Sequence, residues 1–206
     1  MGTNFYARII PTHERKEALK KMIDENRFTD ITHEVDELYR SFNPYNKDDK
    51  PIGEIHLGKR SGGWKFLWNP NVYPLRNGHS ESYTDTDGRT HTEWIWEPDT
   101  AYYVYPLTKE GIKAFIDRED VEVYDEYGEK QDKDTFFKEA LEWTKWHGEE
   151  AYDSATYAKA HPDERHWNND TELTRLLERE GFEFTTPWKY DFYSDGLRFS
   201  SSNEFG

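Results

Sequence analysis

The stretch GEIHLGKRSGGWKFLW, residues 53–68, predicts two β-strands joined by a tight, glycine-rich turn. The segments GEIHLG and WKFLW flank KRSGG, and Gly62 and Gly63 supply the backbone freedom that a short turn requires. Further strands are expected on both sides of this hairpin. They cover residues 4–9, 101–105 and 121–127, two segments around Asp87-Gly88, and a final hairpin turning near Asp195-Gly196.

Helices are predicted between these strands, each opened by a residue that can cap a helix N-terminus. The capping residues are Thr12, Thr108, Asp132 or Asp134, and Asp170 or Thr171. The helix after Thr12 is expected to carry Ala18, Leu19, Met22 and Ile23 on one apolar side, and a further helix is expected over residues 30–39. Strands and helices follow one another in mixed order, without regular alternation. We therefore expect an α+β fold in a single domain over residues 1–206, with an antiparallel sheet and several packed helices. Residues 148–170 are polar and are expected to form an insertion or a loop.

The composition is that of an acidic chain rich in aromatic residues. The 206 residues include 42 acidic and 27 basic side chains, for a formal net charge of −15. Leu, Ile, Val and Phe make up only about 18% of the chain, a fraction typical of disorder, but 8 Trp and 14 Tyr argue for a folded core built from rings. Residues 1–70 are nearly neutral, whereas residues 71–206 carry almost all of the negative charge. This balance argues against direct nucleic-acid binding.

Other classes are excluded by what the sequence lacks. The chain has no cysteine and no apolar run of about 18 residues, so we expect no thiolate chemistry, no disulfide framework and no membrane association. The N-terminus MGTNFYARII does not resemble a signal peptide, and a cytoplasmic location is expected. No nucleophile motif or other catalytic constellation is present, so the chain is not expected to be an enzyme and no cofactor is expected.

The hairpin over residues 53–68 is the first candidate binding site. Its cations, glycines and indole could hold a phosphate or another anion, although their order is wrong for a P-loop. The alternative is a plain β-turn with exposed basic residues and a core tryptophan. The candidate ligand- or partner-binding residues are His56, Lys59, Arg60, Ser61, Gly62, Gly63, Trp64 and Lys65.

The second candidate is an acidic surface within residues 117–153, where 14 acidic residues stand among 5 basic ones. Carboxylates spaced along a surface can imitate the phosphates of a nucleic acid and occupy the basic groove of a host protein. The alternative is a solubilising surface, and the interleaved lysines dilute the field. The candidate residues are Asp117, Glu119, Asp120, Glu122, Asp125, Glu126 and Glu129.

The eight histidines do not have the spacing of a helical zinc site, and no metal is expected. Two weak groupings exist. His79 and His91 flank the turn at Asp87-Gly88 and are placed to face one another across a hairpin. His161 and His166 enclose Asp163 and Glu164.

Four segments together resemble a family of small uncharacterised tailed-bacteriophage proteins. They are GTNFY at residues 2–6, IHLGKRSGGWKF at 55–66, VYDEYGE at 123–129 with its following helix, and YDFYSDG with a later FS near the C-terminus. Members of this family begin GTNYY and carry an HIGKSSxGWxF-like loop and a DEYG-plus-helix element. Many have a Cys-x-x-Cys knuckle between the first two motifs, which this chain lacks. The resemblance implies phage origin.

Two functions follow from these features as expectations. The first is a phage-encoded accessory protein that binds and inhibits a host protein, such as a nucleic-acid-binding or defence protein, in host takeover or counter-defence. The second is a protein that binds or sequesters a nucleotide-like anionic small ligand through residues 56–66.

Overall fold

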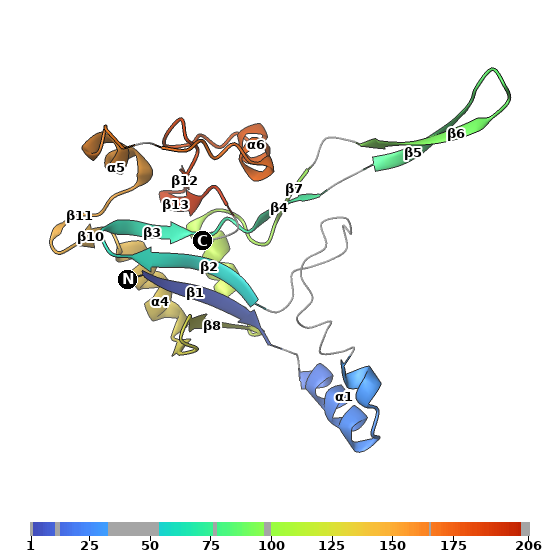
Figure 1. The fold of residues 1–206 in the computed structure, drawn as a ribbon. Coiled ribbons are helices and arrows are strands. Elements are labelled where there is room, and N and C mark those ends of the chain that lie inside the picture. The colour runs from blue at the N-terminus through green and yellow to red at the C-terminus, as the bar shows by residue number, and fades with distance from the viewer. Residues whose placement is uncertain are drawn as a thin grey trace.

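The computed structural model describes residues 2–10, 13–32, 54–75, 78–96, 100–164 and 166–202. Its centre is a seven-stranded sheet in the order β12-β13-β3-β2-β1-β8-β9 (Figure 1). These strands are β1 (Gly2–Ile9), β2 (Glu54–Ser61), β3 (Trp64–Trp68), β8 (Val121–Asp125), β9 (Lys130–Gln131), β12 (Asp191–Ser194) and β13 (Leu197–Ser200). The α+β class is therefore confirmed.

The sheet is mixed, not purely antiparallel as expected. Every neighbouring pair is antiparallel except β13 and β3, which run parallel and pair through Phe199 and Trp68. These two strands are separated by more than a hundred residues of chain, so no hairpin fixes their relative direction.

The predicted hairpin over residues 53–68 is present as β2 and β3, with Gly62 and Gly63 between them. A β-bulge interrupts β2: Phe5 of β1 pairs with Gly58, but the next residue, Tyr6, pairs with His56. Gly58 is required there because a Cβ atom would lie 2.4 Å from the carbonyl oxygen of Leu67. The bulge changes which residues of β2 face each side of the sheet.

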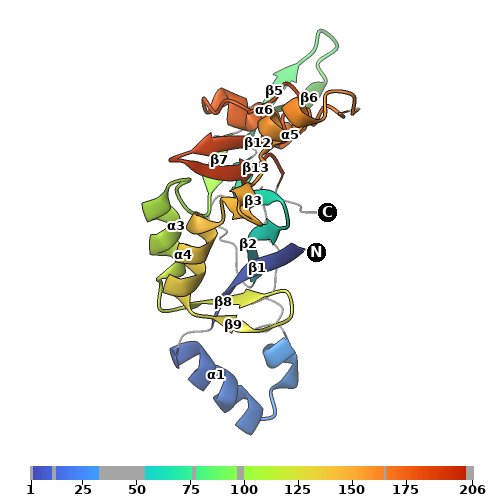
Figure 2. The ribbon, with the colours of Figure 1, turned by 90° about the vertical axis from the view of Figure 1, so that its left-hand side faces the viewer.

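Helices α3 (Lys109–Ile116) and α4 (Lys133–Glu142) cover one face of the sheet (Figure 2). Their predicted caps are confirmed, since the side chains of Thr108 and Asp132 accept hydrogen bonds from the first turn of each helix. Together with α6 (Glu172–Arg179), capped by Thr171, they enclose the core. Aromatic rings form much of that core, which includes Phe5, Phe66, Trp68, Phe115, Phe136, Phe137, Phe192 and Phe199.

Residues 148–170 contain more regular structure than expected. They contribute β11 (Glu149–Glu150), which pairs with β10 (Lys145–Trp146), and the short helix α5 (Ser154–Ala160). Asp153 caps α5 in a capping box with Thr156. This segment lies beside β3, because Tyr152 forms backbone hydrogen bonds with Gly63 and Lys65.

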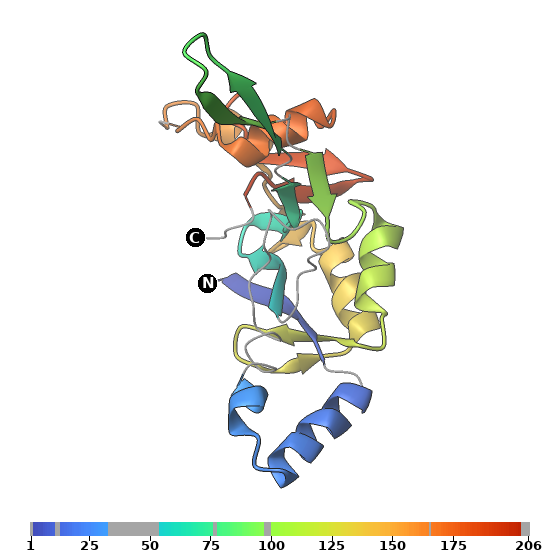
Figure 3. The ribbon, with the colours of Figure 1, turned by 90° about the vertical axis from the view of Figure 1, so that its right-hand side faces the viewer.

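Two elements project from the body at opposite ends of the molecule (Figures 2 and 3). One is the predicted hairpin of β5 (Gly78–Thr84) and β6 (Thr90–Trp96), which lies in the chain between two further paired strands, β4 (Val72–Leu75) and β7 (Thr100–Tyr103). The other is helix α1 (His13–Asp24), whose expected apolar side is not in the core, since Ile23 is 54% exposed. The helix predicted over residues 30–39 lies almost wholly outside the described residues.

Among the described residues, no helix is both long enough and apolar enough to cross a membrane.

Candidate functional site: a cleft on the open face of the sheet

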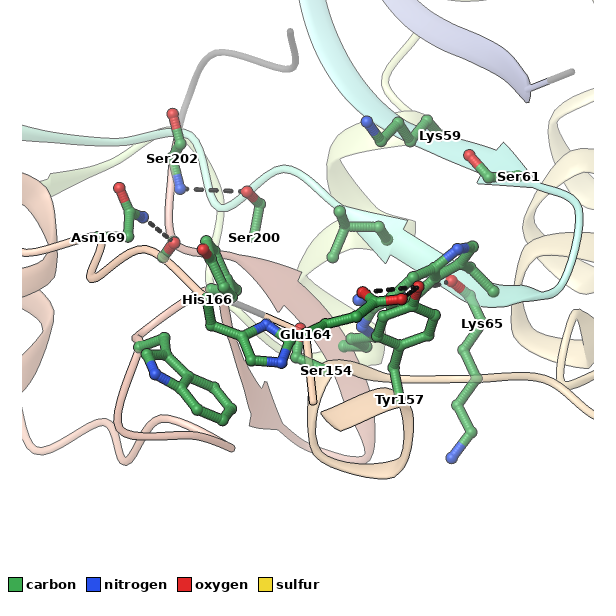
Figure 4. Close-up of a pocket in the computed structure, with 16 residues that line it drawn as sticks. Lys59, Ser61, Lys65, Ser154, Tyr157, Glu164, His166, Asn169, Ser200 and Ser202 are labelled. Carbon is green, nitrogen blue, oxygen red and sulfur yellow. Dashed lines mark hydrogen bonds between the residues drawn. The ribbon is translucent and has the colours of Figure 1, made fainter. Parts of the chain in front are cut away.

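A cleft of about 670 Å³ lies over β2, β3 and β13, and Figure 4 shows the side chains that line it. These strands form its floor, and its other wall comes from α5 and from Glu164, His166, Asn169, Trp188 and Tyr190. This volume is within the range of natural small-ligand sites. The lining residues are Lys59, Ser61, Trp64, Lys65, Leu67, Ser154, Tyr157, Glu164, His166, Asn169, Trp188, Tyr190, Arg198, Ser200, Ser201 and Ser202.

Strand alternation explains why the floor is polar. On β13, Leu197 and Phe199 belong to the core, so Arg198 and Ser200 face the cleft. On β2, Ile55 and Leu57 belong to the core, and unbroken alternation would send Lys59 there as well. The bulge at Gly58 shifts the alternation by one residue, and Lys59 and Ser61 line the cleft instead.

Arg198 is the best-fixed charged group of the floor. Its side chain is 6% exposed, and its Nε donates a hydrogen bond to Asp191, which is itself buried. Its Nη1 donates to the carbonyl oxygen of Lys65 at 3.0 Å, and its guanidinium lies 5.2 Å from the centre of the Trp64 ring. No acceptor among the described residues takes a hydrogen bond from Nη2, so this donor is available to a ligand in the cleft.

Lys59 brings a second cation to the same floor. Burial lowers the pKa of Lys59, and the positive charge of Arg198 lowers it further. The two cations are therefore close enough to repel one another. An anion bound between them would relieve that repulsion.

Lys65 and Trp64 lie at the rim and already have protein partners. Lys65 Nζ lies 3.1 Å from Asp153 and 3.3 Å from Glu150. Burial alone would lower the pKa of Lys65, but these carboxylates outweigh it and raise the pKa. The Trp64 ring packs against Tyr157, with 4.8 Å between ring centres. These two residues hold α5 against β3.

The wall opposite the sheet is aromatic. The rings of His166 and Trp188 lie 4.1 Å apart, at an angle of 32°. His166 Nε2 is buried and has no hydrogen-bond partner among the described residues. Tyr157 donates its hydroxyl hydrogen to Glu164 on the same wall, and Asn169 donates to Ser201 at the cleft's serine-rich end (Figure 4).

Only some residues of the predicted binding loop lie in the cleft. Lys59, Ser61, Trp64 and Lys65 line the cleft, whereas His56, Arg60, Gly62 and Gly63 do not. The guanidinium of Arg60 lies 4.8 Å from the ring centre of Trp143 and 5.7 Å from that of Phe5, and its Nη1 is 3.9 Å from Glu139 on α4. Arg60 therefore lies on the helix-covered side of the sheet and not in the cleft with Lys59.

His56 is also outside the cleft. Its ring stacks on Tyr6, and Nε2 donates a hydrogen bond to the carbonyl oxygen of Gly58 at 3.1 Å. Burial, aided by the charge of Lys59, lowers the pKa of His56 to about 4, although the bond to Gly58 opposes the shift. The neutral ring supports the bulge and is not positioned to contact a bound anion.

The two turn glycines do not form a backbone cradle for a ligand. The Gly63 carbonyl accepts a hydrogen bond from Tyr152 N, and Gly62 lies against Trp146, so that a Cβ there would be 3.0 Å from the indole. The turn is a docking point for residues 146–152.

Sequence reasoning missed most of the site. Arg198, His166 and Trp188 lie far along the chain from the hairpin, in segments interpreted only as strand, loop and turn. The serines at 200–202, at the end of the predicted final hairpin, also line the cleft. One sequence signal for the buried ion pair was available. Asp191 precedes Arg198 by seven residues, and the two lie on the two strands of the predicted final hairpin.

Three of the seven carboxylates of the predicted acidic surface are paired with cations. Asp117 binds Lys113, Asp120 binds Arg118, and Glu122 binds Lys130. Glu126 accepts a hydrogen bond from Asn4, while Glu119 and Glu129 are exposed on the adjoining turns. Neighbouring cations neutralise three of the seven carboxylates, which weakens the field that a nucleic-acid mimic needs.

Asp125 does not belong to an exposed surface at all. Asp125 is only 8% exposed, and its carboxylate accepts hydrogen bonds from the backbone nitrogens of Tyr127 and Glu129. It caps the turn between β8 and β9, and its burial prevents it from presenting a charge to a partner.

The histidine groupings do not form metal sites among the described residues. His79 pairs with Ile95 and His91 pairs with Tyr83, so the two histidines do not face one another as expected. His79 instead contacts Glu81 on the same strand, and His91 contacts Asp85 across the turn. His161 stacks on Tyr157, apart from the His166–Trp188 stack.

Comparison of the chain with protein-family models, curated proteins and solved structures finds no match.

Proposed function

We propose that the chain is a binding protein that captures a small, phosphate-bearing anion in the cleft. The observation that carries the proposal is the convergence of Lys59 and the buried Arg198 on one concave floor. Asp191 balances the charge of Arg198 from below, and Lys59 brings a second cation to the same floor. Hydroxyl groups at Ser61, Ser200 and Ser202 supply further donors beside them.

The arrangement of side chains in the cleft favours ligand binding over catalysis. Arg198 is fixed by Asp191 and Lys65, and a preorganised guanidinium loses little entropy when it takes a phosphate. Among the described residues, the hydroxyl groups of the lining serines Ser61, Ser154, Ser200 and Ser201 are not bonded to a histidine or a carboxylate base. We therefore propose capture without turnover.

The acidic surface supports a second proposal less well. This proposal is that a phage-encoded accessory protein inhibits a host protein. Its support is the sequence resemblance and the exposed carboxylates of Glu119, Glu126 and Glu129. The pairing of Asp117, Asp120 and Glu122 leaves too few unpaired carboxylates for mimicry of a nucleic acid. The cleft is the better-supported binding surface.

Thermal denaturation with inorganic phosphate and ribose 5-phosphate tests the proposal. Ribose 5-phosphate is expected to raise the Tm of the unmodified protein, because a ligand that binds only the folded state stabilises it. Lys59→Met, which keeps the length of the side chain but removes the charge, is expected to abolish most of that shift. The matched control Lys138→Met, on the exposed side of α4, is expected to retain it. Equal shifts in both variants would overturn the assignment of the site.

A further inference from the structure

We propose that the captured ligand is a nucleoside monophosphate, with its phosphate on Lys59 and Arg198 and its base against His166 and Trp188. This inference rests on the proposed function and adds a second subsite to it. The two ends of the cleft differ in chemistry: the sheet side is cationic and rich in hydroxyls, whereas the facing wall is aromatic. A ligand that satisfies both ends joins an anionic group to a flat ring.

His166 Nε2 is the sharpest evidence for the second subsite. A buried polar atom without a hydrogen-bond partner costs about 1–3 kcal/mol, so such atoms are rare in native structures. Here the atom belongs to a ring lining the cleft, and Trp188 holds that ring by stacking at 4.1 Å. Because the atom is covered in the unliganded structure, we expect a bound ligand to displace the side chains that cover it and to supply the missing hydrogen-bond partner.

A nucleobase meets both requirements of this wall. Its edge carries hydrogen-bond donors and acceptors in the ring plane, which can pair with an imidazole nitrogen in either tautomer. Its faces are apolar and stack on Tyr, Trp and His rings. Trp188, which contacts the His166 ring, and Tyr190 belong to the same lining and supply such surfaces.

Glu164 sets the orientation and limits the number of phosphates. Its carboxylate accepts the hydroxyl hydrogen of Tyr157 at 3.1 Å and lies on the same wall as His166 (Figure 4). A second anionic group at this end would be repelled, whereas N–H donors of a base would be attracted. The phosphate therefore belongs at the Lys59 end, and a chain of phosphates reaching toward Glu164 is disfavoured.

Isothermal titration calorimetry with four probes tests the base subsite: inorganic phosphate, ribose 5-phosphate, adenosine 5′-monophosphate and uridine 5′-monophosphate. At least one nucleotide is expected to bind about tenfold or more tighter than ribose 5-phosphate, because one buried hydrogen bond plus stacking is worth at least that factor. His166→Phe preserves a ring on Trp188 but removes Nε2. It is expected to abolish the nucleotide's advantage and leave the affinity for ribose 5-phosphate unchanged.

Trp188→Leu is expected to have the same selective effect. Its matched control is Trp167→Leu, because Trp167 is 68% exposed and lies outside the cleft lining. If Trp188→Leu fails to fold, as judged by circular dichroism, the result for His166→Phe alone decides whether the base subsite exists.

The outcomes separate this inference from the proposed function. Equal affinity of ribose 5-phosphate and both nucleotides, with no effect of His166→Phe, overturns the base subsite and leaves anion capture intact. Absence of binding by every phosphate-bearing probe overturns both.

Discussion

At the scale of single residues, the ion pair between Asp191 and Arg198 fixes the floor of the cleft. Asp191 accepts hydrogen bonds from Arg198, from the hydroxyl of Thr185 and from the backbone nitrogen of Ser154. One carboxylate thus ties β12 to β13 and to the start of α5. The same residue orients the cation that we assign to the ligand.

Asp191→Ala is expected to lower the free energy of unfolding by about 3–5 kcal/mol, because it leaves the Arg198 charge buried without its partner. Urea denaturation followed by tryptophan fluorescence measures the change. Asp170→Ala, which removes an exposed carboxylate beside Lys189 and Arg175, should cost less than about 1 kcal/mol. A similar loss in the two variants would contradict the role given to Asp191.

His56 makes stability depend on pH. Its folded-state pKa of about 4 lies below the ordinary value of 6.5, so between these values the unfolded chain binds a proton that the folded chain does not. Stability is therefore expected to fall as pH decreases through this range.

The variant His56→Phe retains a ring for Tyr6 and removes the titration. The loss of unfolding free energy between about pH 7 and about pH 5 is expected to be smaller in the variant than in the unmodified protein. Urea denaturation at the two pH values gives both differences. An identical loss in both proteins would show that His56 is not buried as a neutral ring.

At the scale of elements, the bulge in β2 decides which cation reaches the cleft. Without it, simple alternation would group Arg60 with His56 on the open face and send Lys59 to the core. The bulge depends on Gly58, whose missing side chain leaves room for the Leu67 carbonyl.

Gly58→Ala is expected to cost about 1–3 kcal/mol of stability, because the new methyl group meets backbone atoms that cannot move independently. Since relief of the clash requires β2 and β3 to shift, the affinity for ribose 5-phosphate should fall as well. Chemical denaturation and calorimetry measure the two effects. A variant as stable as the unmodified protein would contradict the tight approach of β2 to β3.

Local signals made most elements predictable from sequence. Thr108, Asp132 and Thr171 cap helices as expected, and the glycines at 62–63, 88 and 196 mark hairpin turns. These signals act within a few residues, so sequence alone contains them. Helix α1 shows their limit: its apolar spacing predicted the helix correctly but did not place Ile23 in the core.

The site was less predictable because it is assembled over long distances. Lys59 and the Trp64–Lys65 pair could be identified from their glycine-rich surroundings. The bulge that turns Lys59 toward the cleft depends on packing between strands, which no local pattern encodes. Arg198 joins them only because β13 lies beside β3 in parallel.

At the scale of the whole molecule, the two differently charged parts of the sequence meet at the cleft. The nearly neutral N-terminal third supplies Lys59, and the acidic remainder supplies Arg198 together with the carboxylates that hold Arg198 and Lys65 in place. The acidic residues near the cleft thus serve mainly to fix cations. The aromatic residues that replace the scarce aliphatic ones form both the core and the wall that faces the ligand.

Phosphate binding by Lys59 and Arg198 in the cleft can be observed directly in a crystal structure of the protein grown with saturating nucleoside monophosphate. We predict phosphate density in the cleft, with its oxygens within about 3.5 Å of Lys59 Nζ and Arg198 Nη2. An empty cleft, or a phosphate bound elsewhere on the protein, would contradict the account.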